Sequence, residues 1–348
     1  MSSKFSRRDF LKLVGASMTG LAFSNYLPAS PGVFDDGQLI RVGIAQVSVY
    51  HLPDDTSRIV RSVYRDDILH AYEEVTAATP DWNPVWYRVW GGFIHRAHMQ
   101  KVQFIYNDPA KSIRPTKQVA EVTVPYTQAL RQIGKDWETS YRLYYGTVHW
   151  VVGVDEGPDG QPWYRIQDQL LPVFYDVPAT HLRLIPDEEI APISPEVAFE
   201  NKRIAVSLNN RTVTCYEYDK VVFHTDVSTG LPNSGPDPSA TRTPAGEFHV
   251  EVKMPSKHMG DGNLAADVGA YELIGVPWVS FFTSQGHAFH GTYWHDNFGQ
   301  QMSHGCINMR TEEAKWIFRW CMPAAPADQI SPLTLDKKGY GTTVKIGP

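Results

Sequence analysis

Scarce cysteine, weak net charge and the lack of a basic run narrow the class of protein. The 348 residues contain only 3 Cys, at positions 215, 306 and 321, which is too few and too scattered for a disulfide framework. The formal net charge is −6, and no stretch of Lys or Arg has the length that binds a phosphate backbone. Nucleic acid is therefore not expected as a partner.

What the chain does contain favours a mainly β protein of more than one domain. A length of 348 residues predicts two or three domains, and 42% hydrophobic residues are enough to build packed cores. The 25 Pro and 26 Gly, together with 10 Trp and 17 Tyr, indicate short strands and turns rather than long helices.

The N-terminus has the layout of a bacterial twin-arginine export signal. Ser6-Arg7-Arg8-Asp9-Phe10-Leu11-Lys12 precedes the moderately apolar run 13–23, which is too short and too rich in Gly and Ser for a stable membrane span. Residues 1–37 are predicted to be this signal and a linker, and to direct the protein through the twin-arginine route to the cell envelope, where the signal can contact the membrane. An ordinary basic helix is the alternative. Cleavage near 27–30 is left open.

Residues 39–190 show the alternation of half-buried strands and a weak internal repeat. Leu39–Tyr50 alternates apolar and polar side chains, and a further strand is expected at 68–75. Val85-Trp86-Tyr87-Arg88-Val89 recurs as Pro162-Trp163-Tyr164-Arg165-Ile166, and Ala97-His98-Met99 has a counterpart in 179–182. Two copies of one small β-unit explain this repeat.

The repeated unit resembles tandem bacterial SH3-like barrels. The resemblance predicts one module at residues 38–110 and a second, with a linker, at residues 111–192. In cell-envelope enzymes such modules often contact the wall, so wall contact is what the resemblance implies here.

The last predicted domain spans residues 193–348. Three strands are expected at 203–208, 212–216 and 220–224, with Asn209-Asn210 as a hairpin turn, so an antiparallel meander is the simplest topology. The convincing helix of this domain is 311–321, because its apolar residues have helical spacing and Pro323 follows.

Two neighbouring stretches, 287–295 and 303–309, concentrate reactive side chains and predict an active site. They hold four of the 13 His and one of the 3 Cys. A cysteine thiolate attacks carbonyl carbon readily, and a nearby imidazole can take the thiol proton. Gly305 lets the backbone turn beside Cys306, so that the local N–H groups face an oxyanion. Asn308 lies on the same face of an extended segment as Cys306.

The residue types alone do not decide which histidine is the general base, nor whether the cluster binds a metal ion instead. His304 shares the face of Cys306, whereas His290 would have to come from an adjacent strand. A zinc site built from His287, His290, His304 and Cys306 is the rival chemistry, but its spacing fits no ordered ligand pattern. No metal and no cofactor are therefore expected.

The pairs His290-Gly291 and Ser303-His304-Gly305-Cys306-Ile307-Asn308 resemble the signature of the L,D-transpeptidase (YkuD-type) catalytic domain. Segments 228–230 and 243–248 are also similar to that family. The resemblance implies a YkuD-type β-sandwich in which Cys306 is the nucleophile, His290 the general base and His304 a supporting residue of the turn. The Gly291 carbonyl would hold the imidazole.

The spacing between the histidine and the cysteine turn differs from that usual in the family, so a second histidine is considered as the general base. Only twelve residues separate His290 from Ser303, fewer than is usual in the family, and His287 would give a gap of fifteen.

The insertion between Lys253 and Phe282 resembles the lid over the family's substrate groove. Trp278, Tyr293 and Trp294 are expected to line that groove, with packing in the core as the alternative for each. Ser303, Gly305, Asn308 and Gly291 complete the predicted substrate and oxyanion set.

The activity that the resemblance implies is peptidoglycan L,D-transpeptidation. The cysteine attacks the bond between the third residue and the D-alanine of a stem peptide, D-alanine leaves, and a side-chain amine of a neighbouring stem resolves the acyl-enzyme. Stem peptides are then the partners, as donor and as acceptor. An L,D-carboxypeptidase that uses water on the same acyl-enzyme, or a non-catalytic wall-binding protein, are the alternatives.

Overall fold

A computed structural model describes residues 37–80, 83–115, 117–232, 241–260, 272–325 and 341–348. Residues 1–36 of the predicted twin-arginine signal and linker (1–37) lie outside the described residues, as does part of the predicted lid, at residues 261–271. Among the described helices, none has the length and apolar character needed to cross a membrane. The architecture is mainly β, as the sequence predicts.

The N-terminal β-unit, residues 38–102, consists of two small sheets. One has the strand order β4-β1-β8 and the other β3-β2-β7-β6-β5. Its own hydrophobic core includes Ile40, Val49 and Ile94, each with no exposed surface. The strands are β1 (Gln38–Val42), β2 (Gln46–Tyr50), β3 (Ile59–Tyr64), β4 (Ile68–Ala71), β5 (Glu73–Thr76), β6 (Val85–Val89), β7 (Gly92–His95) and β8 (Met99–Val102).

Two strands expected in this unit are each broken in two. The segment 39–50 forms β1 and β2, and 68–75 forms β4 and β5, so the prediction of continuous strands was wrong. The first break has a tertiary cause. A Cβ on Gly43 would lie 2.3 Å from the backbone oxygen of Trp294, so only glycine allows this close approach.

The middle β-unit, residues 118–184, is one seven-stranded sheet with the order β11-β10-β14-β13-β12-β9-β15. Part of its apolar surface, including Val119, Val148 and Trp150, belongs to the same core as the C-terminal residues. The strands are β9 (Gln118–Val122), β10 (Tyr126–Ile133), β11 (Asp136–Tyr144), β12 (Val148–Glu156), β13 (Pro162–Gln167), β14 (Phe174–Pro178) and β15 (Leu182–Leu184).

The internal repeat read from the sequence corresponds to a structural repeat. In β6 and in β13 the Trp-Tyr pair is buried and the following Arg is exposed. Each unit then has a short 3-10 helix, η1 (Arg96–His98) or η2 (Ala179–His181), that leads directly into its last strand, β8 or β15. Equivalent residues therefore occupy equivalent places in the two β-units.

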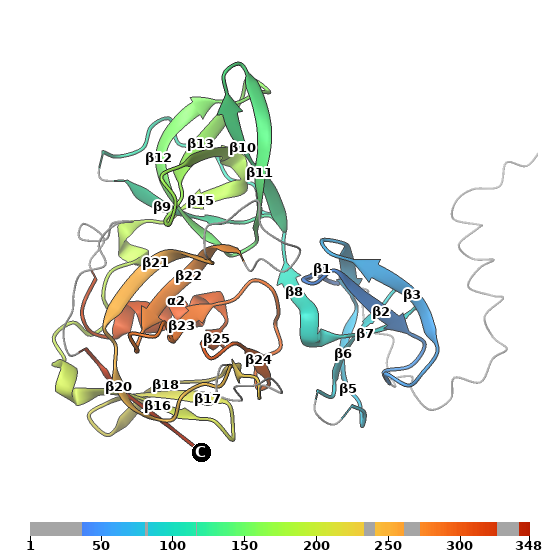
Figure 1. Cartoon of the computed structure of the whole chain (residues 1–348), viewed down its shortest axis with the longest axis vertical. Coiled ribbons are helices and arrows are strands. Elements are labelled where there is room, and N and C mark those ends of the chain that lie inside the picture. Colours follow the sequence, from blue (N-terminus) through green and yellow to red (C-terminus); the bar gives the residue numbers. More distant parts are fainter. Residues whose placement is uncertain (1–36, 81–82, 116, 233–240, 261–271, 326–340) are drawn as a thin grey trace, which may run out of the picture. The chain divides into compact units, whose positions relative to one another are not determined.

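In the described part of the C-terminal domain, residues 202–347, the helix α2 lies between two sheets (Figure 1). One sheet has the order β18-β17-β16-β26-β20, the other β21-β22-β23-β25, and β19 pairs with β24. The elements are β16 (Lys202–Ser207), β17 (Thr212–Glu217), β18 (Lys220–Asp226), β19 (Thr229–Gly230), β20 (Gly246–His249), β21 (Val252–Met259), β22 (Leu273–Phe281), β23 (Ala288–Gly291), β24 (Gln301–Ser303), β25 (Ile307–Met309), α2 (Thr311–Trp320) and β26 (Thr343–Gly347).

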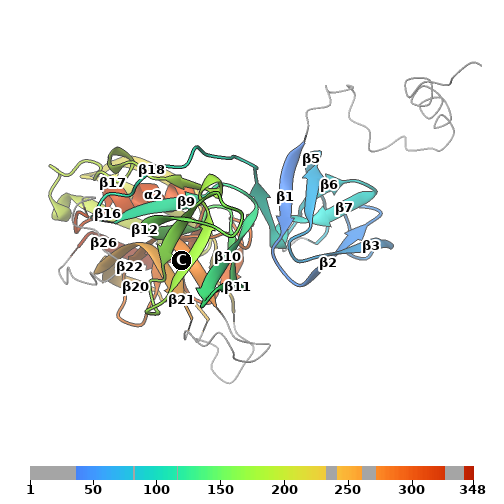
Figure 2. The ribbon, with the colours of Figure 1, turned by 90° about the horizontal axis from the view of Figure 1, so that it is seen from above.

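The predicted meander and helix are both present in this domain. β16, β17 and β18 pair antiparallel in succession. The helix α2 buries Ala314, Ile317 and Phe318, the apolar positions at helical spacing, and it ends at Trp320 because the next residue is extended. The helix contacts β22 and β23 of the second sheet, and Figure 2 shows the same elements from above.

Arg41 in β1 connects all three parts of the described chain. Its guanidinium donates to Asp66 at 2.9 Å, to Gln100 at 2.8 Å and to the backbone oxygen of Tyr293 at 2.6 Å. It also stacks over the ring of Tyr144, with 4.1 Å between the guanidinium carbon and the ring centre. Arg41 is 2% exposed, so this charge is held almost entirely by protein groups.

His258 in β21 is clamped between two carboxylates. Its Nδ1 lies 2.9 Å from an Asp168 oxygen, and its Nε2 lies 2.5 Å from a Glu272 oxygen. Asp168 belongs to the middle β-unit, so this cluster ties that unit to the β21–β22 hairpin. Burial lowers the pKa of His258, but the two carboxylates outweigh it and the net pKa is raised.

This clamp predicts a pH-dependent contribution to stability. Because the folded-state pKa of His258 is raised, its contribution is fully present below the unfolded value of about 6.5 and is lost as the pH rises through the folded pKa. We expect the difference in unfolding free energy between wild type and His258→Gln to shrink from pH 6 to pH 9 in denaturant titrations. A difference that is constant or grows over this range would contradict the clamp.

Candidate functional site

The turn that carries Cys306 is organised by Ser303. The Ser303 hydroxyl donates to the Cys306 carbonyl at 2.5 Å and accepts from the Gly305 N–H at 3.2 Å. Gly305 has a φ of +112°, and a Cβ there would lie 2.9 Å from the His287 ring. The turn therefore requires glycine for its backbone and for the approach of that ring. The Gly305 N–H, predicted to face the substrate, is instead used inside the turn.

His290 lies on the strand beside the cysteine turn. β23 runs parallel to β25 and places His290 opposite Asn308. The His290 Nδ1 is 3.0 Å from the backbone oxygen of Gly291, the contact expected from the family resemblance. Because a carbonyl can only accept, Nδ1 carries the proton and Nε2 is the free, basic nitrogen.

His287, the alternative base, has a different environment. Its Nδ1 lies 2.9 Å from the Thr283 hydroxyl, and its ring packs against Gly305. His287 is not among the residues that line the cleft described next. The predicted supporting residue, His304, is exposed and does line that cleft.

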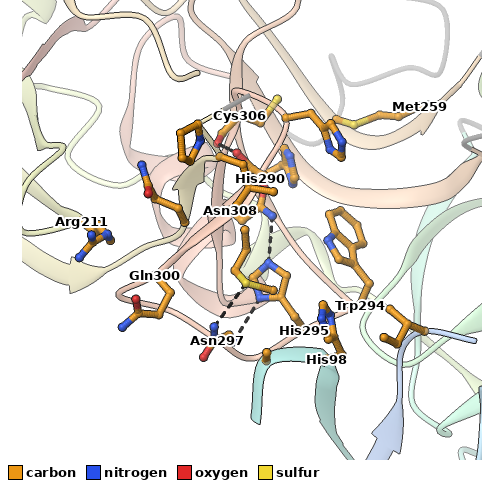
Figure 3. A pocket seen from close by; sticks show the side chains of 18 residues that line it. His98, Arg211, Met259, His290, Trp294, His295, Asn297, Gln300, Cys306 and Asn308 are labelled. Atoms are coloured by element: carbon orange, nitrogen blue, oxygen red, sulfur yellow. Dashed lines mark hydrogen bonds between the residues drawn. The ribbon is translucent and has the colours of Figure 1, made fainter. Parts of the chain in front are cut away.

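Cys306 and His290 open into one cleft of about 820 Å³ (Figure 3). The Cys306 thiol also contacts the Gly286 carbonyl at 3.6 Å. Other parts of the C-terminal domain supply Met259, Trp294 and Asn308 to the wall. The N-terminal β-unit contributes the remaining wall residues of interest, which are Ile44, Ala97 and His98.

The predicted groove residues are divided between the cleft and the core. Trp294 lines the cleft, with its ring centre 5.9 Å from that of His290. Trp278 instead has no exposed surface and packs on Phe318, and Tyr293, 4% exposed, stacks on Tyr144. Trp278 and Tyr293 therefore do not line the cleft, and the prediction that they line the groove was wrong.

Three contributions to the cleft had no signal in the sequence. Ala97 and His98 lie about 200 residues before the cysteine turn and Ile44 about 260, and nothing local marks them as site residues. His295, which the sequence left unassigned, is fully buried and contacts the Asn308 amide. Its position next to the predicted groove aromatics was the available hint.

The thiol and the imidazole are both uncharged at neutral pH. Burial raises the pKa of Cys306 to about 11, although the Ala288 backbone opposes this. Burial lowers the pKa of His290 to about 4, against the Gly291 hydrogen bond. The resting pair is therefore a thiol and a neutral imidazole.

This protonation state predicts how Cys306 reacts with iodoacetamide. Below a thiol pKa of about 11, alkylation should accelerate roughly tenfold per pH unit, because the thiolate is the nucleophile. Intact-mass kinetics between pH 6 and pH 9 would measure this. A rate that is already constant near pH 7 would instead indicate a thiolate–imidazolium pair. Cys215 and Cys321 are fully buried and should react far more slowly.

The described residues hold no group of three or more His, Cys, Asp or Glu that is placed to bind a metal ion. Two features characterise this domain. A helix lies between two sheets, and the turn that carries the cysteine leads into a strand that pairs with the strand of His290.

Comparison with known proteins shows what this domain is similar to. Residues 201–346 match the YkuD family model, the L,D-transpeptidase catalytic domain. A Bacillus licheniformis protein that carries the L,D-transpeptidase YkuD name is 33% identical over 111 residues, which is 32% of this chain and 54% of that protein. The chain thus spans about half the length of this curated relative. The C-terminal part of the chain is thus similar to the L,D-transpeptidase catalytic domain.

Solved structures with this similarity include two L,D-transpeptidases. A mutant of the Enterococcus faecium enzyme is 25% identical, over 43% of this chain and 50% of that chain, with a TM-score of 0.31. The Mycobacterium smegmatis enzyme is 18% identical, over 51% of this chain and 74% of that chain, with a TM-score of 0.32.

Proposed function

We propose that the protein is a peptidoglycan L,D-transpeptidase that works through a Cys306 thioester. The observation that carries this proposal is that Cys306 and His290 line one cleft, with the Nδ1 of His290 held by Gly291 so that Nε2 is left as the base. The YkuD match over residues 201–346 supports the same reaction.

The acylation step follows from these positions. His290 Nε2 takes the Cys306 proton as the sulfur attacks the carbonyl of the third stem residue. Backbone N–H groups of the cysteine turn other than that of Gly305 stabilise the oxyanion. The carbon–nitrogen bond then breaks, and the D-alanine amine leaves with the proton from His290. A thioester remains on Cys306.

Deacylation uses the same groups in reverse. A side-chain amine of a second stem attacks the thioester, His290 accepts the amine proton, and the proton returns to the departing sulfur. The product is a new amide cross-link. Water in place of the amine would give the carboxypeptidase reaction. Met259 and Trp294 contribute apolar side chains to the cleft wall.

The proposal extends to location and to the β-units. The Arg7-Arg8 motif supports export by the twin-arginine route to the cell envelope. We assign wall contact to the two SH3-like β-units, since the N-terminal unit exposes several large aromatic side chains, among them Trp90 at 80% and Tyr64 at 57%.

Product analysis tests the reaction. Full-length protein is incubated with a stem tetrapeptide, with and without a second stem as amine donor, and the products are identified by mass. We expect D-alanine release and a cross-linked dimer. Tripeptide as the sole product would reassign the enzyme as a carboxypeptidase. Unchanged tetrapeptide would contradict both.

A further inference from the structure

His295 and Asn308 form a buried pair beside the cysteine that the mechanism above does not use. The His295 Nε2 and the Asn308 amide lie 3.1 Å apart, and Figure 3 shows Asn308 between His290 and His295. His295 has no exposed surface and Asn308 is 1% exposed. Both residues line the cleft that Cys306 opens into.

Hydrogen bonds fix the backbone of Asn308 and of the segments next to it. Asn308 exchanges two backbone hydrogen bonds with Ser228, at 2.9 Å and 2.8 Å. The Ser228 hydroxyl in turn donates to the Asn297 carbonyl at 2.9 Å. The orientation of the Asn308 amide is therefore the main freedom that is left at this position.

A fixed donor decides the tautomer of His295. The backbone N–H of Asn297 donates to His295 Nδ1 at 3.1 Å, so Nδ1 carries no proton. A neutral imidazole must then carry its proton on Nε2. Burial lowers the pKa of His295 to about 3, which agrees with a neutral ring at pH 7.

The tautomer in turn decides the orientation of Asn308. An Nε2–H needs an acceptor, and the amide nitrogen of Asn308 can only donate. Amide oxygen and nitrogen have nearly the same shape and are assigned from the hydrogen-bond network. The amide atom that faces His295 is therefore the oxygen, and the NH₂ group occupies the other position.

We propose that His295 is a positioning residue that holds the Asn308 amide with its NH₂ group toward the Cys306 cleft, as a donor to a peptide carbonyl of the bound stem. The hydrogen bond to the His295 ring uses one amide atom of Asn308, and Asn308 lines the cleft, so the other amide atom can serve a bound peptide. This proposal rests on the proposed function, since it names the part of the stem peptide that the cleft recognises.

The first test measures the tautomer directly and does not depend on activity. Long-range proton–nitrogen spectra of the full chain with labelled histidine should show His295 as the neutral Nε2–H form throughout roughly pH 5–8. The His295 signals are those that disappear in His295→Gln. An Nδ1–H tautomer, or a charged ring near neutral pH, would overturn the proposal.

The second test uses matched variants and tetrapeptide kinetics. Asn308→Asp can still accept from His295 but presents an oxygen to the cleft, so we expect KM to rise roughly tenfold or more, with a smaller change in kcat. His295→Phe should give a similar rise in KM, because it frees the amide. His295→Gln, which retains one donor and one acceptor, should stay close to wild type.

These outcomes separate the two proposals. A wild-type KM in Asn308→Asp would overturn the role of Asn308, even in an active enzyme. Equal losses in His295→Gln and His295→Phe, both in kcat, would indicate a purely structural role. If wild type neither turns over peptide nor forms an adduct, the proposed function fails, while the tautomer result still decides how His295 is placed.

Discussion

Cys306→Ala is expected to abolish turnover of stem tetrapeptides, by at least about 10⁴-fold, while the protein remains folded. In the proposed mechanism the sulfur of Cys306 forms the covalent bond, and neither of the other described cysteines lines the cleft. Cys215 and Cys321 have no exposed surface. Initial rates of D-alanine release, measured on purified wild type and variant, give the comparison.

A matched control uses another cysteine of the same domain. Cys321 lies against the Ser280 hydroxyl in the core, 3.8 Å from it, and makes no contact with the cleft. Cys321→Ala should therefore keep its catalytic rate, with at most a modest loss of stability. Turnover that survives in Cys306→Ala would exclude the thioester mechanism.

Arg41→Met is expected to cost about 3–5 kcal/mol of stability, because it removes one partner of a buried ion pair. The side chains of Arg41 and Asp66 are 2% and 6% exposed. The substitution also leaves the Tyr293 carbonyl without its 2.6 Å donor, one residue before the cleft-lining Trp294. Denaturant titration should show the loss, and catalytic activity should fall with it.

The same carboxylate supplies the control for this prediction. Arg142 also pairs with Asp66, at 2.5 Å, but its side chain is 43% exposed. Arg142→Ala should cost only about 0–1 kcal/mol, since solvent screens an exposed pair. Arg41→Lys should be intermediate or worse, because an ammonium cannot reproduce the forked contacts to Asp66, Gln100 and Tyr293. Equal effects of Arg41→Met and Arg142→Ala would contradict this account.

Gly305 indicated a tight turn beside Cys306, and the structure has that turn. The chain from Ser303 to Asn308 is short, so its residue types decide the turn by themselves: Ser303 closes it and Gly305 permits its φ of +112°. The mainly β fold was also predictable, because alternation of apolar residues follows directly from the geometry of a half-buried strand.

Contacts between residues far apart in the chain were not predictable. The break between β1 and β2 occurs at Gly43, where the backbone meets Trp294, about 250 residues later. The sequence was compatible with Trp278 either in the groove or in the core. In the structure Trp278 packs on Phe318 and so belongs to the core. The tautomer of His295 depends on one backbone N–H, from Asn297, which no composition or spacing reveals.

The most direct measurement of the central claim is the intact mass of the full-length protein after reaction with a carbapenem, followed by peptide mapping. We expect one covalent adduct per chain, on the peptide that contains Cys306, and none on Cys306→Ala. An unmodified wild-type protein, or an adduct that persists in Cys306→Ala, would contradict the assignment of Cys306 as the acyl carrier.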